Sequence, residues 1–142
     1  MSGARALVAT MKAHGAYTAI VSGGFKIYTS RVRELLGFDE DQGNELEIAA
    51  SALTGRLREP IVNRDGKLDA LLRIARARGV GAADVLAVGD GANDLPMLLA
   101  AGLGVAFHAK PAVAAALKMR VEYADLTALL FFQGYRRAEF VE

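Results

Sequence analysis

Apolar and polar positions along this chain predict helices and strands that follow one another in alternation. The first helix is expected to end before Gly15, because its apolar residues recur at spacings of three and four and glycine favours helix ends. A strand over residues 17–21 follows, and then a second helix that ends before Gly37. Strands that alternate with helices are typical of a parallel sheet with right-handed connections. The expected fold class is therefore α/β.

A different pattern occupies the middle of the chain. Leu46 and Ile48 alternate with acidic residues, and Leu57 lies between two arginines. This period of two predicts a β-ribbon over residues 45–59, with its connection at residues 51–54. We expect the ribbon to be an insertion in one domain that spans residues 1–142.

After the ribbon the helical period returns. A third helix is predicted to open at Lys67, and the arginines near its end are interpreted as a solvated face. Short apolar runs then predict further strands, each followed by a helix. The expected order is a strand at 85–88, a helix at 94–101, a strand at 103–107, a helix from Pro111 to 119, an edge strand at 121–123 and a helix at 126–133.

Composition narrows the class of protein. The chain has 142 residues, 53% of them apolar, which is enough for one domain with a buried core. No apolar run is long enough to cross a bilayer, and the absence of cysteine excludes disulfides and thiol catalysis. The net charge of +1 argues neither for nor against an anionic polymer as a partner. We expect a cytoplasmic protein with neither a membrane nor a nucleic-acid partner.

The residues that follow the predicted strand at 85–88 carry the strongest chemical signal. Asp90, Asn93 and Asp94 lie in the run Gly-Asp-Gly-Ala-Asn-Asp, at the carboxyl end of that strand. Open α/β sheets bind their ligands at this end of the strands. Oxygen ligands without a neighbouring cysteine or histidine suit Mg²⁺ rather than zinc. The run therefore predicts a magnesium site.

Two weaker signals lie elsewhere. Ser22, Gly23 and Gly24 follow the first predicted strand and precede a helix, so a hydroxyl and backbone N–H groups could bind phosphate there. The same three residues are also common in an ordinary turn. Lys67 lies near a helix start, where a lysine is most often a surface residue. Neither signal decides a function by itself.

Together the three sites resemble a known family. Ser22, Lys67 and the run at residues 89–94 match, in order and rough spacing, the second, third and fourth motifs of the haloacid dehalogenase-like (HAD) phosphatases. The chain is similar to bacterial phosphoserine phosphatases over nearly its whole length, including residues 104–111 and 133–136. The resemblance implies a HAD-like Rossmannoid sheet with flanking helices, and Mg²⁺-dependent hydrolysis of L-phosphoserine in serine biosynthesis.

The resemblance also implies a role for each matching residue. Asp90 would bind Mg²⁺ directly. Asp94 would bind it through water and would orient Lys67, which neutralises charge on the phosphoryl group. The residues that would contact the phosphoryl group are Ser22, Gly23, Lys67 and Asn93.

One element of the family is missing from these residues. The first motif, Asp-x-Asp-x-Thr, carries the nucleophile that forms an aspartyl-phosphate, and the one Asp-x-Asp run, at residues 39–41, is interpreted as a solvated loop. The helical cap that selects the substrate is absent too. We therefore expect an incomplete core that lacks the central strand, with self-association or pairing with a missing amino-terminal part.

Other functions remain open at this point. Pro96 after the Gly-Asp-Gly-x-Asn-Asp run also occurs in the phosphorylation domain of P-type ATPases, and another HAD phosphatase would share all three motifs. An inactive fragment or a non-catalytic interaction module would explain the missing nucleophile. In either case we expect this chain alone to have no phosphatase activity.

Overall fold

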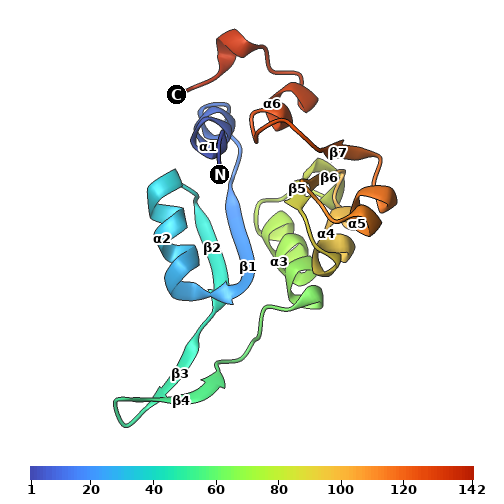
Figure 1. Ribbon diagram of the computed structural model, residues 1–142. Coiled ribbons are helices and arrows are strands. Elements are labelled where there is room, and N and C mark those ends of the chain that lie inside the picture. The colour runs from blue at the N-terminus through green and yellow to red at the C-terminus, as the bar shows by residue number, and fades with distance from the viewer.

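The computed structural model describes all 142 residues as an α/β chain (Figure 1). No helix has the length and apolar character that crossing a membrane requires. The helices are α1 (Ala4–Ala13), α2 (Lys26–Leu36), α3 (Arg64–Ala77), α4 (Leu95–Ala100), α5 (Pro111–Ala116) and α6 (Ala128–Phe132). The strands are β1 (Ala19–Phe25), β2 (Glu40–Asn44), β3 (Leu46–Ala49), β4 (Ala52–Leu57), β5 (Leu86–Gly89), β6 (Leu103–Phe107) and β7 (Met119–Val121).

The parallel sheet is divided into two separate parts. Strands β1 and β2 pair in parallel, and β5, β6 and β7 form a second parallel sheet in that order. The predicted parallel α/β class is confirmed. Figure 1 shows β1 and β2 beside α2 on one side, with β5, β6 and β7 beside α3, α4 and α5 on the other. We call residues 19–44 the β1–β2 unit and residues 64–121 the β5–β7 unit.

The division leaves two strand edges without a partner. Strand β1 pairs only with β2, and β5 pairs only with β6. Strands of parallel sheets are normally buried on both faces, yet no residue of β1 is buried and β5 has a single buried residue, Ala87. The free edges of β1 and β5 are therefore open to another strand.

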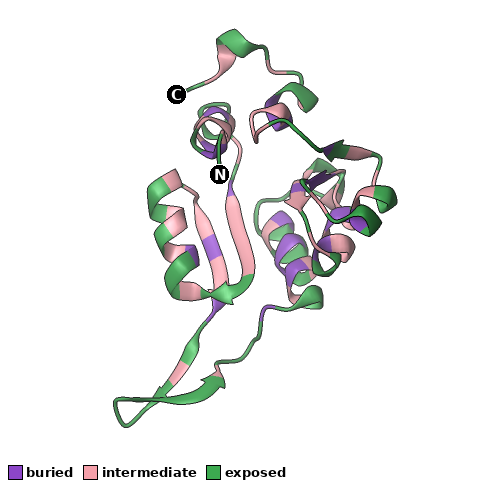
Figure 2. Cartoon of the chain, viewed as in Figure 1, coloured by how far each residue is buried: buried purple, intermediate pink, exposed green.

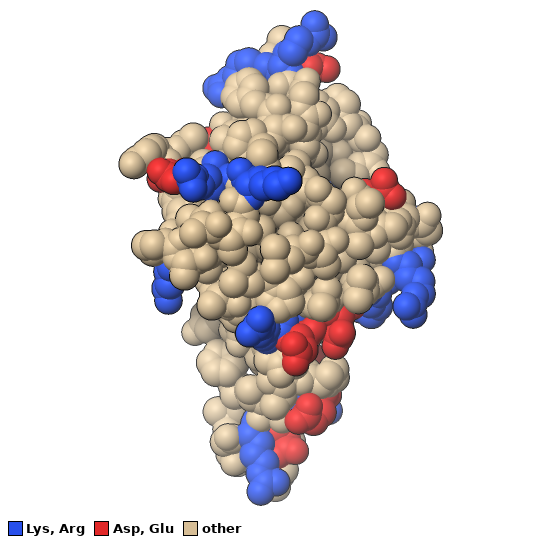
Figure 3. Space-filling model, turned by 90° about the vertical axis from the view of Figure 1, so that its right-hand side faces the viewer, with Lys and Arg blue, Asp and Glu red and all other residues tan.

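Most of the apolar core lies in the β5–β7 unit. One cluster contains Leu98 and Val113, and a second contains Val105, Phe107 and Leu129. Figure 2 shows the purple of buried residues concentrated on this side. Figure 3 shows the face on which α4, α5 and β7 lie, with a broad uncharged centre and side chains of both charge signs at its rim.

The β1–β2 unit is instead stabilised by buried polar groups. Asp41, which is 8% exposed, accepts hydrogen bonds from Thr29 (2.8 Å) and Ser30 (3.0 Å) and forms ion pairs with Lys26 (3.1 Å) and Arg33 (3.3 Å). The solvated loop predicted at residues 39–41 is therefore wrong. Glu40 and Asp41 are the first two residues of β2, and the carboxylate of Asp41 is buried because α2 supplies all four partners.

The apolar residues Tyr28, Val32, Leu35 and Leu36 share one face of the second helix by their spacing, but the helix buries a different face. Thr29 is its one buried residue, whereas Tyr28 and Leu35 are 69% and 51% exposed. Close contact between α2 and β2 explains which face of the helix is buried. A Cβ atom at Gly43 would lie 2.8 Å from Oγ1 of Thr29 and 3.0 Å from the backbone of Lys26, so only glycine lets the helix approach.

The ribbon of β3 and β4 extends away from both units (Figure 1). Its strands are antiparallel, with Ile48 opposite Leu53, and these side chains are 67% and 64% exposed. The connecting residues Ala50 and Ser51 have positive φ angles of 51° and 65°. A tight turn of this kind matches the twist of the two strands, although neither residue is the glycine or asparagine that usually marks it.

Several predicted boundaries shift by a few residues. The first strand begins at Ala19 rather than at residue 17, and the third helix begins at Arg64 rather than Lys67. The fifth helix ends at Ala116, so the edge strand starts at Met119 instead of residue 121. The last helix is shorter than expected, spanning Ala128–Phe132. These differences follow from caps and pairing partners that hydrophobic spacing does not report.

Candidate functional site

The turn after β5 positions two carboxylates by means of a glycine. A Cβ atom at Gly89 would lie 2.6 Å from the side chain of Asp94, so no other residue fits where this carboxylate folds back. Asp94 is 4% exposed, and its Oδ2 accepts hydrogen bonds from the backbone N–H groups of Asp90 and Gly91, each at 3.1 Å. The turn is thus fixed by its own carboxylate.

Lys67 joins this turn to α3. Its Nζ donates a hydrogen bond to Oδ1 of Asp94 at 2.5 Å, and the lysine is 8% exposed. Burial raises the pKa of Asp94, but the hydrogen bond and charge of Lys67, with the two backbone donors, hold that pKa below its ordinary range. Lys67 is therefore a buried residue paired with Asp94 rather than a surface residue, and its role beside a phosphoryl group stays a prediction.

The start of α3 explains how Lys67 reaches the turn. Asn63 caps the helix, because its side chain accepts a hydrogen bond from the N–H of Gly66 at 2.9 Å. Lys67 therefore lies one turn inside the helix. Sequence reasoning missed this cap. An asparagine followed by an acidic residue in the first turn, here Asn63 and Asp65, is nevertheless a recognised signal for a helix start.

Asp90 and Asn93 lie at the exposed edge of the same turn. The carboxylate of Asp90 makes no hydrogen bond or ion pair with the chain, so it is free to bind a cation. Both oxygens of Asp94 are already engaged, and no group of three or more His, Cys, Asp or Glu side chains gathers anywhere in the chain. The donors here amount to one free carboxylate, which fits half of a Mg²⁺ site.

Ser22 and Gly23 lie in a bulge of β1. Val21 pairs with Gln42 and Phe25 with Asn44, so three residues of β1 oppose a single residue of β2. Residues 22–24, which we call the Ser-Gly-Gly segment, thereby leave the ladder just before α2 begins. The hydroxyl of Ser22 accepts a hydrogen bond from the N–H of Gly24 at 3.0 Å. The segment was expected to follow the strand, and instead it bulges within it.

The Ser-Gly-Gly segment lies against the chain that leads into α3. A Cβ atom at Gly23 would lie 3.4 Å from the carbonyl oxygen of Val62, which is five positions before Lys67. Ser22 makes no hydrogen bond to Lys67, so their common phosphate pocket stays a prediction. The buried side chain of Asn44 bonds both the Ser-Gly-Gly segment and the chain that leads into α3. Sequence reasoning missed this residue, because no motif or spacing singled it out.

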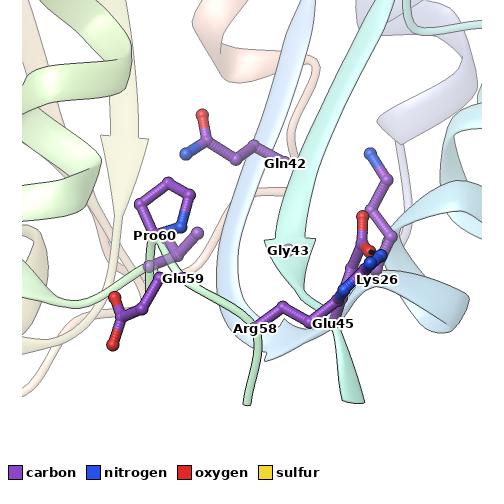
Figure 4. A pocket seen from close by; sticks show the side chains of 8 residues that line it. Lys26, Gln42, Gly43, Glu45, Arg58, Glu59 and Pro60 are labelled. Carbon is purple, nitrogen blue, oxygen red and sulfur yellow. Dashed lines mark hydrogen bonds and ion pairs between the residues drawn. The ribbon is translucent and has the colours of Figure 1, made fainter. Parts of the chain in front are cut away.

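A concavity beside these elements is separate from the predicted site. It has a volume of about 350 Å³ and lies between the base of the ribbon and the carboxyl end of β2 (Figure 4). Its two cations are already paired, Lys26 with Asp41 and Arg58 with Glu45. None of the predicted site residues lines it. The lining residues are Lys26, Gln42, Gly43, Glu45, Arg58, Glu59, Pro60 and Val62.

Comparison with known proteins decides the family. The model of the haloacid dehalogenase-like hydrolases matches residues 1–99 of the chain. The chain belongs to this family. A phosphoserine phosphatase of Streptomyces coelicolor is 48% identical over 137 residues, which are 96% of this chain and 33% of that protein. One from Methanocaldococcus jannaschii is 37% identical over 128 residues, covering 90% of this chain and 61% of that protein.

Solved structures of the family agree with the fold. A crystal structure of a probable phosphoserine phosphatase from Vibrio cholerae superposes on this chain with a TM-score of 0.82 at 45% sequence identity. The superposed region covers 87% of this chain and 38% of the Vibrio cholerae chain. The predicted HAD-like sheet and the resemblance to phosphoserine phosphatases are both confirmed. The chain spans only about a third of the length of the Streptomyces coelicolor relative.

Proposed function

We propose that this chain supplies the phosphate-binding and metal-binding part of a phosphoserine phosphatase, which hydrolyses L-phosphoserine to L-serine and phosphate. The observation that carries the proposal is the buried pair of Lys67 and Asp94 at the carboxyl end of β5, beside the free carboxylate of Asp90. The names of the relatives favour phosphoserine over other phosphomonoesters and over the P-type ATPase alternative. A cytoplasmic role in serine biosynthesis follows from that substrate.

The roles of the chain's own residues follow from the physics of phosphoryl transfer, in which most of the catalysis is positioning and charge stabilisation. Lys67 would place a positive charge beside the phosphoryl group, because its hydrogen bond to Asp94 keeps it from turning away. Ser22 would donate its hydroxyl hydrogen to a phosphoryl oxygen, with the N–H of Gly23 beside it. Asn93, which is exposed at the same turn, would contact another oxygen.

Mg²⁺ fits this arrangement as an ion that oxygens of both the protein and the substrate would bind. Magnesium is commonly bound by one or two carboxylates together with phosphate oxygens and water. Asp90 would be the direct protein ligand, and Asp94, whose oxygens are engaged, would act only through water. When bound, the ion would neutralise negative charge on the phosphoryl group.

The nucleophile is the part that these residues do not contain. Residues 39–41 are the only Asp-x-Asp run, and Asp41 is enclosed by four partners of α2. We propose that an aspartate on another polypeptide segment forms the aspartyl-phosphate, and that its strand pairs with the free edges of β1 and β5. Self-association would be a weaker substitute, because it covers the edges without adding an aspartate.

Two assays of phosphate release from L-phosphoserine test this proposal. The chain alone, with Mg²⁺, should show no measurable turnover. Turnover of about 1 per second or faster, which is ordinary for enzymes, would show that a residue of this chain acts as the nucleophile. The second assay adds the part of the Streptomyces coelicolor relative that this chain does not span, and activity should then appear.

Variants of the second assay identify the metal ligand. Asp90→Asn should reduce turnover at least about a hundredfold and weaken Mg²⁺ binding, because it removes the one free carboxylate of the turn. Asp69→Asn, the same change at an exposed position of α3, is the matched control and should leave both unchanged. Equal activity of the two variants would reject Asp90. Phosphate binding without any turnover in the second assay would favour the non-catalytic module.

A further inference from the structure

Asn44 connects the two groups that the proposed function places around one phosphate. It is the last residue of β2 and is 3% exposed. Its Nδ2 donates to the carbonyl of Gly23 at 2.8 Å and to the carbonyl of Val62 at 3.2 Å, and its Oδ1 accepts from the N–H of Val62 at 2.6 Å. One side chain therefore bonds the Ser-Gly-Gly segment and both polar groups of the Val62 backbone.

Val62 passes this constraint on to Lys67. It is itself 3% exposed, and it directly precedes Asn63, the residue that caps α3. The carbonyl of Asn63 accepts the backbone N–H of Lys67 at 3.1 Å. Hydrogen bonds thus join Gly23 to Asn44 and Asn44 to Val62, and the peptide bond from Val62 to Asn63 leads into the helix of Lys67. The Nζ of Lys67 then bonds Asp94.

Other contacts between the two units are exposed and adaptable. Arg73 of α3 bonds Glu40 and Gln42 of β2, and the guanidinium of Arg78 lies 4.6 Å from the ring centre of Tyr17. Long side chains at the surface hold a distance only loosely. A buried carboxamide with all three hydrogen bonds made is rigid, because water cannot replace a partner that moves away.

We propose that Asn44 is a positioning residue that sets the separation between the Ser-Gly-Gly segment and the helix of Lys67. Both would contact the same phosphoryl group, so this inference rests on the proposed function. Only a carboxamide provides two donors for the carbonyls and one acceptor for the N–H of Val62. A carboxylate of the same shape would place oxygen against both carbonyls.

The test compares variants of this chain by two measurements. The first is the affinity of the folded chain for inorganic phosphate with Mg²⁺, followed by NMR at the amides of residues 22–24 and 67. The second is the distance between spin labels on α2 and α3, at Leu35→Cys and Leu72→Cys, which are 51% and 42% exposed. The chain has no native cysteine, so both labels attach specifically.

Asn44→Asp and Asn44→Ala should each lower phosphate affinity about tenfold or more and broaden the distance distribution, since two buried carbonyls lose their donor. The matched control is Asn63→Asp, because a capping side chain only accepts and aspartate caps equally well. It should leave both measurements unchanged. A residue that only stabilised the fold would lower the melting temperature and leave the phosphate affinity of the folded molecules as it was.

Three results would overturn the proposal or separate it from the proposed function. Native phosphate affinity and a narrow distance distribution in folded Asn44→Ala would reject it. Unfolding of every Asn44 variant, including the milder Asn44→Ser, would also reject it, because Asn44 would then be required for the fold itself. If the unaltered chain binds no phosphate, the proposed function fails, and the spin-label distances alone still decide whether Asn44 sets the separation.

Discussion

The β1–β2 unit and the β5–β7 unit both contain parallel strands and flanking helices, but different kinds of groups stabilise them. The β5–β7 unit buries apolar side chains from every layer, among them Leu71, Leu98, Val105 and Phe107. The buried residues of the β1–β2 unit are Thr29, Asp41 and Asn44, all polar, with no apolar residue among them.

The difference follows from the number of strands in each sheet. A two-stranded sheet has little independent stability unless other elements cover its faces. The β1–β2 unit keeps its shape through hydrogen bonds between β2 and α2, while its apolar strand β1 remains partly open. The β5–β7 unit has three strands and covering helices, so it already has a core of its own. The candidate site draws residues from both units and therefore depends on the weaker one.

The largest fall in stability is expected when an apolar side chain next to the β5–β7 unit is removed. Leu129→Ala, at a position that is 0% exposed and packed in the cluster of β6 and β7, should lower the free energy of unfolding by about 3 kcal/mol. Val21→Ala in β1, which is only partly buried, should cost about 1 kcal/mol or less. Urea titration measures both. Equal losses would show that β1 is as well packed as the apolar cluster on β6 and β7.

A smaller fall in the free energy of unfolding is expected when the polar cluster around Asp41 in the β1–β2 unit is changed. Asp41→Asn should cost about 1 to 3 kcal/mol, because it removes a charge that two cations face and leaves fewer acceptors for the two hydroxyl donors. Glu34→Gln is the control, since Glu34 pairs only with exposed Arg31 at 3.4 Å. That pair should contribute about 0.5 kcal/mol or less. A loss in Asp41→Asn no larger than in the control would mean that the cluster does not stabilise the unit.

Low pH should lower the stability of both units, because it protonates the carboxylates of Asp41 and Asp94. Burial raises the pKa of Asp41, but hydrogen bonds from Thr29, Lys26 and Ser30 hold it below its ordinary value, as Lys67 and two backbone N–H groups do for Asp94. A lowered pKa in the folded state contributes stability that is complete above the unfolded value of about 3.9 and is lost as the pH falls through the folded pKa. The urea midpoint should therefore be steady near neutral pH and fall below about pH 4. Asp94→Asn should flatten this dependence, and an unchanged slope would contradict the assignment.

The smallest effect is expected in the ribbon. Leu53→Ala should change the free energy of unfolding by less than about 0.5 kcal/mol, because the side chain is 64% exposed and lies outside both units. The same change at Leu98, which is 1% exposed, is the matched comparison for thermal unfolding. A large loss at Leu53 would indicate that the ribbon packs against something in solution, such as a second copy of the chain.

The sequence by itself determined the local features of this protein. Alternation of strands and helices predicted the parallel α/β fold, because periodicity reports which face of an element is buried. The Gly-Asp-Gly-Ala-Asn-Asp run predicted the turn after β5, since Gly89 and Asp94 interact over only a few positions. The family followed from the same residues and is confirmed by the comparisons.

Tertiary structure alone decided which polar groups are buried and which strand edges are free. Asp41 was expected in a solvated loop and is enclosed by α2, and Asn44 carried no signal although it bonds Gly23 and Val62. Thr29 lies 12 positions from Asp41, and Val62 and Gly23 lie 18 and 21 positions from Asn44. Hydrophobic spacing cannot report such contacts, because a buried polar residue is stable only where distant backbone and side-chain groups satisfy its hydrogen bonds.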